Sequence, residues 1–163
     1  MMAPPQALVD AAQGWAHLYS KTKAVSMAVT YIHLAGILLG GGAAVAADRD
    51  TLRAASDPEP VRAYHLTFLA TVHNVAIGGL ALIVVSGLLM FFADLETFWG
   101  SRIYWLKMSL FVLLLLNGAL MKRAEGLVAT NPDAAWKNLK TTSLTSLILW
   151  FTILLAGVIL MSA

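Results

Sequence analysis

Two histidines stand inside stretches of sequence that are otherwise apolar. His33 is the only His, Lys, Arg, Asp or Glu between residues 24 and 47, and His73 stands within the apolar stretch 66–93. Ionisable residues inside a membrane are functional by default, and neutral imidazoles are suitable axial ligands for haem iron. The chain has no cysteine, so covalent c-type attachment of haem is excluded. The pair favours a haem b whose iron is bound by His33 and His73.

Small residues follow His33 at helical spacing. Gly36, Gly40 and Ala44 come three, seven and eleven residues later, so they form one stripe on a helix of about 3.6 residues per turn. Such a stripe admits a flat neighbour, either another helix or a planar cofactor. We expect Gly36 and Gly40 to contribute to cofactor binding. The structural alternative is that the two histidines only form hydrogen bonds between helices, for example to Thr30, Asn74 or Ser86.

Three residues near the ends of the apolar stretches are further candidates for cofactor binding. Lys107 lies about one helical turn inside a third stretch, where its ammonium either reaches the lipid headgroups or binds a haem propionate or a quinone carbonyl. Arg49 follows the first stretch and is a second candidate for a propionate, although membrane topology alone explains it. His65 binds a second haem or a propionate in one interpretation. In the other, simpler interpretation it is solvated at the membrane surface.

The elements that must position these residues are predicted to be membrane-spanning helices. The chain has 163 residues, of which 59% are hydrophobic and only 12% charged, whereas about a quarter of the residues in soluble domains are charged. Four apolar stretches suit the roughly 20 residues that a spanning helix needs: about 24–47, 66–93, 103–121 and 143–163. We therefore predict an all-α fold, an integral membrane four-helix bundle that forms a single domain over residues 1–163.

The segment borders predict the topology. Apolar residues at helical spacing before Lys23 predict a short N-terminal amphipathic helix on the membrane surface, and no cleavable signal peptide is recognised there. Seven Lys and Arg residues flank the borders 48–65 and 122–142, against four on the opposite side. The positive-inside rule then places both termini outside. Because the basic residues are scattered along membrane borders, no nucleic-acid partner is expected.

Short motifs resemble small four-helix membrane families of bacteria. His33-x-x-Gly36 and the later Ala47-Asp48-Arg49 are similar to their first helix, and residues 86–92 and 104–108 to their second and third helices. These families are akin to the copper-resistance D-type membrane proteins and to the four-helix membrane protoporphyrinogen oxidase. In the oxidase a first-helix histidine, an arginine after that helix and a third-helix lysine after tryptophan are hallmark positions.

This resemblance implies functional roles for His33, Arg49 and Lys107, an association with haem, and a location in the bacterial inner membrane. The sequence departs from the oxidase in one stretch. The usual Leu-Pro-Arg-Leu-Phe-Val-Tyr-His is absent, and Ala-Ala-Asp-Arg-Asp-Thr-Leu stands at residues 46–52.

Three functions follow from these observations. The first is a b-type cytochrome that exchanges electrons with a quinone or a partner redox protein. The second is a cofactor-free accessory subunit of a larger respiratory or photosynthetic membrane complex. The third is a membrane enzyme that oxidises a porphyrin. The sequence shows no catalytic triad or phosphate-binding loop, which argues against hydrolases and ATP-driven pumps.

Overall fold

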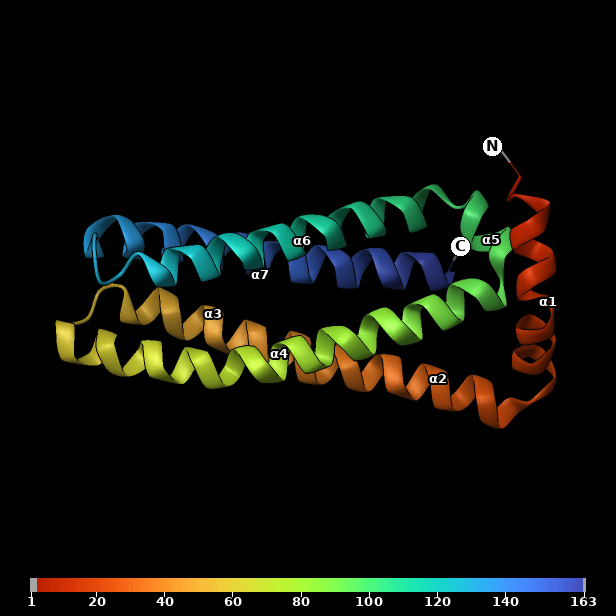
Figure 1. The fold of residues 1–163 in the computed structure, drawn as a ribbon, viewed down its shortest axis with the longest axis horizontal. Helices are drawn as coiled ribbons and strands as arrows, with labels where there is room; N and C mark the ends of the chain where they lie inside the picture. Colours follow the sequence, from red (N-terminus) through yellow and green to blue (C-terminus); the bar gives the residue numbers. More distant parts are fainter. Residues whose placement is uncertain (1–2, 163) are drawn as a thin grey trace.

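The computed structural model describes residues 3–162, except for the side chains of residues 59–61 and 63. Four long helical segments lie alongside one another, and a short helix, α1 (Gln6–Lys21), crosses one end of them (Figure 1). Within the described residues, four segments are long and apolar enough to cross a membrane: Lys23–Ala54, Tyr64–Ala93, Arg102–Gly126 and Pro132–Ser162. The predicted all-α, four-span membrane bundle with a short N-terminal helix is confirmed.

The first span is one continuous helical segment with a π-helical turn in its middle. It comprises α2 (Lys23–Gly36), the π-helix η1 (Ile37–Gly41) and α3 (Gly42–Ala54). The sequence predicted an end at residue 47, directly before the charged residues 48–50. That boundary was wrong because Asp48 is buried against a neighbouring helix and does not end the segment.

The remaining spans also extend beyond their apolar stretches. They are α4 (Glu59–Ala93), α6 (Arg102–Gly126) and α7 (Pro132–Ser162), with the short α5 (Leu95–Gly100) between α4 and α6. The predicted starts at residues 66 and 143 were late, because hydropathy detects the part of a helix that suits lipid and not its polar continuation. Residue 163, the predicted end of the fourth span, lies outside the described residues.

The bundle consists of two helical hairpins. The first span packs along α4, while α6 packs along α7, and the hairpins meet mainly where α3 contacts α7. Trp150 of α7 is buried at the centre of this contact. Its ring lies against η1, where a Cβ added to Gly41 would be 3.1 Å away.

Glycines allow the first span and α4 to approach at backbone distance. A Cβ on Gly36 would lie 3.0 Å from the carbonyl oxygen of Gly79, and a Cβ on Gly79 would overlap the backbone of Gly40. Such contacts between small residues are typical of tightly packed membrane helices. The stripe of small residues after His33 is therefore filled by α4, and it is not open to a planar cofactor.

Helix α1 is fixed to the end of the first hairpin. The indole nitrogen of Trp15 donates a hydrogen bond to the carbonyl oxygen of Leu89, at 2.7 Å. The helix crosses the bundle at the end where α7 also finishes (Figure 1). This end is called the α1 end below, and the end with residues 55–58 and 127–131 is called the opposite end.

Candidate functional site around His33

His33 of α2 forms a hydrogen bond with Ser86 of α4. Its ring atom Nδ1 lies 2.9 Å from the Ser86 hydroxyl oxygen. The serine is buried and the histidine is half-buried. Gly87, the next residue of α4, lies beside the ring, since a Cβ added there would be 3.5 Å from His33 Cε1. The inter-helix hydrogen bond from His33 to Ser86, one of the alternatives left open by the sequence, is confirmed.

The Ser86 hydroxyl determines which nitrogen of His33 carries the proton. The hydroxyl donates its one hydrogen within its own helix, to the carbonyl oxygen of Leu82. With its hydrogen on Leu82, the hydroxyl accepts from His33, and this arrangement assigns the proton to Nδ1 and a lone pair to Nε2. The imidazole also forms a hydrogen bond with the backbone of Ile83. A histidine that is oriented through Nδ1–H in this way is prepared to bind a metal or accept a proton at Nε2.

Lys107 of α6 extends this cluster to the second hairpin. Its ammonium nitrogen is turned towards α7, where it lies 3.5 Å from the position of a Cβ added to Gly157. Its charge also acts on His33. His33 and Ser86 are in direct contact, and Lys107 of a third span acts on His33 through its charge. These three residues are called the His33 cluster below.

The His33 cluster lies in the half of the bundle next to α1. His33 is ten residues from the start of α2, Ser86 is seven residues from the end of α4, and Lys107 is five residues from the start of α6. At about 1.5 Å per residue these positions are roughly 15, 10 and 8 Å from the α1 end. The cluster is therefore inside the apolar part of the bundle but closer to one surface.

His73 lies away from the His33 cluster. Its Nδ1 faces a carboxylate oxygen of Glu125 on α6 at 3.5 Å, and Lys122 pairs with the same carboxylate at 3.2 Å. On α4, His73 comes 13 residues before Ser86, a distance of about 20 Å along the helix axis. Because His33 is bonded to Ser86, the two imidazoles lie at different depths. The structure does not bring them together as ligands of one iron.

Counted from the charged residues Asp48 and Arg62, His33 and His73 would lie at similar depths, about 6 Å apart. The helix that contains His33 continues to Ala54, and α4 begins at Glu59. Neither border is thus the end of its helix, and the depths derived from them do not correspond.

His65 is buried near the opposite end of the bundle, with 6% of its surface exposed. Its Nε2 lies 2.9 Å from the hydroxyl oxygen of Thr51, and that hydroxyl donates to the carbonyl oxygen of Ala47. His65 is therefore the donor, and the bond joins α4 to α3. Its ring also lies beside Phe68 and Trp136. The interpretation of His65 as a solvated surface residue was wrong.

Arg49 does not join the His33 cluster. It is exposed on α3, sixteen residues after His33 on the same span, which is about 24 Å along the helix. The positions that the family resemblance groups together are therefore divided: His33 and Lys107 lie at one end of the bundle, and Arg49 lies towards the other.

Of the two histidines considered as iron ligands, only His33 is suited to bind a haem in this structure. The free Nε2 has the chemistry of an axial ligand, and the Lys107 ammonium suits a propionate carboxylate. His73 faces Glu125 at another depth. Between residues 3 and 162, no group of three or more His, Asp and Glu side chains is arranged to hold a metal ion. A haem that is ligated by His33 and His73 together does not fit this structure.

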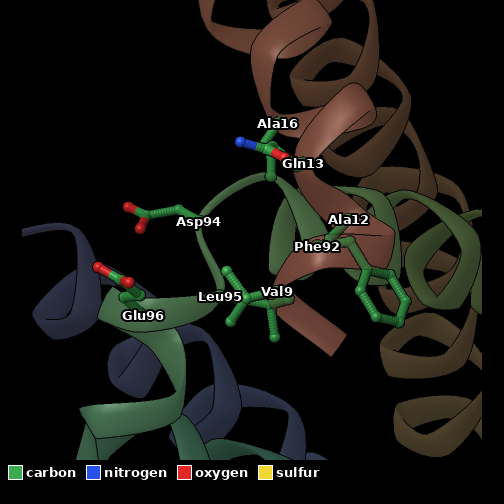
Figure 2. Close-up of a pocket in the computed structure, with 9 residues that line it drawn as sticks. Val9, Ala12, Gln13, Ala16, Phe92, Asp94, Leu95 and Glu96 are labelled. Carbon is green, nitrogen blue, oxygen red and sulfur yellow. The ribbon is translucent and has the colours of Figure 1, made fainter. Parts of the chain in front are cut away.

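A shallow pocket lies under α1, apart from this cluster. Figure 2 shows Val9 of α1 and Leu95 of α5 meeting at its centre, with Phe92 on one side and the carboxylates of Asp94 and Glu96 on the other. None of the predicted site residues lines this pocket. It is a seam where α1 rests on the end of α4.

Sequence reasoning missed two groups of polar residues. Glu125, the partner of His73, stands in the polar border 122–142, outside the predicted spans. Ser143 and Ser146 lie on one face of α7 and are buried, facing the carboxyl group of Asp48. Their spacing of three residues in an apolar stretch was the available signal.

No family model, curated protein or solved structure matches the chain.

Proposed function

We propose that this chain is a membrane haem protein of the b-type cytochrome class, in which His33 is the iron ligand. The observation that carries the proposal is the hydrogen bond from His33 Nδ1–H to Ser86, which leaves Nε2 free. Hydrogen bonds of this kind orient the histidines that bind metals in proteins. His73, which the sequence suggested as the second ligand, is not part of the proposal.

The chain's own residues have separate roles in this proposal. Ser86 holds the imidazole of His33 in one orientation, and Lys107 neutralises a propionate in the apolar half of the bundle. When bound, haem supplies one-electron transfer, with a quinone or a partner redox protein as the electron partner. The distribution of Lys and Arg supports an orientation with the α1 end and both termini outside.

The first experiment is a visible absorption spectrum of the full chain, purified after expression with ample haem, in the oxidised and the dithionite-reduced forms. We expect a Soret band and a reduced α band in the wild type and in His73→Ala and His17→Ala. We expect both bands to be lost in His33→Gly and restored when imidazole is added, since free imidazole replaces the missing ligand. Lys107→Gln should retain less haem than the wild type.

Two outcomes would contradict the proposal. One is full haem content in His33→Gly without imidazole. The other is a featureless spectrum of the wild type after growth with haem. Far-ultraviolet circular dichroism of each variant separates loss of haem from loss of the fold.

A porphyrin-oxidising enzyme is the second candidate, because Lys107 is turned into the bundle, where a substrate carboxylate would meet it. Purified protein incubated with protoporphyrinogen and a quinone as the electron acceptor distinguishes the two candidates. Turnover that is lost in Lys107→Gln, without a resident haem spectrum, would favour the enzyme. The cofactor-free accessory subunit has less support, because Gly36, Gly40 and Gly79 pack against one another within the chain and not against a partner.

A further inference from the structure

A buried carboxyl group lies between the first and fourth spans. Asp48 of α3 is only 3% exposed, and the hydroxyls of Ser143 and Ser146 on α7 face it. These serines are 0% and 7% exposed. Asp48 Oδ2 has no hydrogen-bond partner of ordinary geometry, and the same is true of Ser143 Oγ. Two buried polar atoms at one place thus lack a hydrogen bond of ordinary geometry, as His73 Nδ1 and Glu125 Oε1 do elsewhere in the bundle.

The hydroxyl of Ser143 differs from others in the bundle. Thr51, Ser86 and Thr142 each donate to a carbonyl oxygen about one turn earlier in their own helix, as hydroxyls inside helices commonly do. Ser143 makes no such bond. Its hydroxyl is therefore available to a group bound at the Asp48 carboxyl.

No charged side chain compensates Asp48. Both ion pairs recorded for the described residues involve Glu125 on α6, and neither involves Asp48. On α3 itself, Arg49 is exposed and Asp50 acts on His65. On α4, the Nε2 of His65 is bonded to a threonine hydroxyl, and Arg62 donates to the carbonyl oxygen of Ala55 at the end of α3. On α7, Ser143 and Ser146 face the carboxyl group.

An ionised carboxylate without a counter-charge is very costly inside a membrane protein. One positive charge at Oδ2 removes that cost. The ligand atoms are one carboxylate and two hydroxyls, all hard oxygen donors, and a single negative charge balances a single monovalent cation. We propose that Asp48, Ser143 and Ser146 form a binding site for one monovalent cation, a proton or a sodium ion. The site is independent of the His33 cluster.

Infrared spectroscopy of the full chain in lipid vesicles tests this site. In sodium-free buffer at mildly acidic pH we expect the C=O stretch of a protonated carboxyl group that is absent from Asp48→Asn. Labelling aspartate with ¹³C at the side-chain carboxyl should shift the same band without any mutation. Ser143→Ala and Ser146→Ala should change its frequency, because each removes a hydroxyl that contacts the carboxyl.

The response of the band to added salt distinguishes the two cations. A band that is lost when sodium chloride is added, but not when choline chloride is added, identifies sodium as the physiological occupant. A band that neither salt affects identifies the proton. Glu125→Gln is the control for another acidic residue near the membrane and should leave the band unchanged. The absence of any aspartate band in sodium-free buffer overturns the proposal, and so does a band that neither serine variant affects.

Discussion

Gly79 of α4 packs directly on Gly40 of the π-helical turn, so closely that no side chain fits between the two backbones. Gly79→Ala should therefore force the first two spans apart and lower the free energy of unfolding by about 1–3 kcal/mol, the usual cost of overpacking a core. Gly78, the residue before it, has nothing within 4 Å of an added Cβ. Gly78→Ala is the matched control in an unfolding titration with sodium dodecyl sulfate, and equal stability of the two variants would contradict the packing.

Asn117 joins the two helices of the second hairpin. Its side-chain nitrogen donates to the carbonyl oxygen of Thr142 at 2.9 Å, in a buried position. Asn117→Leu should lower the free energy of unfolding by roughly 0.6 kcal/mol, the average value for hydrogen bonds between membrane helices. Asn74→Leu, at an exposed position of α4, provides the comparison. The same titration measures both, and a larger loss for Asn74→Leu would count against this role.

The pair His73–Glu125 links α4 to α6 near the opposite end of the bundle. A double-mutant cycle with His73→Gln and Glu125→Gln should give a coupling energy of a few tenths up to about 1 kcal/mol, as is typical of partly exposed ion pairs. The coupling should weaken when ionic strength is raised, since salt screens exposed charges. Strictly additive effects of the two substitutions would show that the contact contributes nothing.

Trp15 holds α1 against the bundle through its bond to Leu89. Trp15→Phe keeps an aromatic ring but removes the N–H donor, so α1 should detach more often. Loss of about 1 kcal/mol corresponds to roughly fivefold faster cleavage by trypsin after Lys21 or Lys23. Trp105→Phe is the control, because its indole bonds only locally, to the carbonyl oxygen of Trp99. Equal cleavage rates in the two variants would show that the Trp15 bond does not hold α1.

The spans could be predicted from sequence because lipid imposes a length and an apolar composition on each of them. Their ends could not. Asp48 looks like the end of a span, yet two serines 95 and 98 residues further along the chain cover it. The hydropathy of a local stretch cannot reveal a packing partner that lies so far along the chain.

The candidate site was predicted in part for a related reason. The position of His33 inside a span was visible from the sequence, and Ser86 was among its possible partners. Whether His33 faces His73 depends on the axial position of the first span relative to α4. The contact between Gly40 and Gly79 fixes that position. A stripe of glycines predicts close approach but not the neighbour. The stripe was interpreted as a cofactor surface, but in the structure Gly36 and Gly40 pack against α4.

The division into two hairpins has a consequence for how the protein is made. Each hairpin crosses the membrane twice and returns to the side where it began, and each makes most of its contacts within itself. The first hairpin can thus complete its glycine interface while the ribosome is still synthesising α6 and α7. Insertion in two pairs is the expected biogenesis, and a chain divided within α5 should assemble from two separately translated fragments.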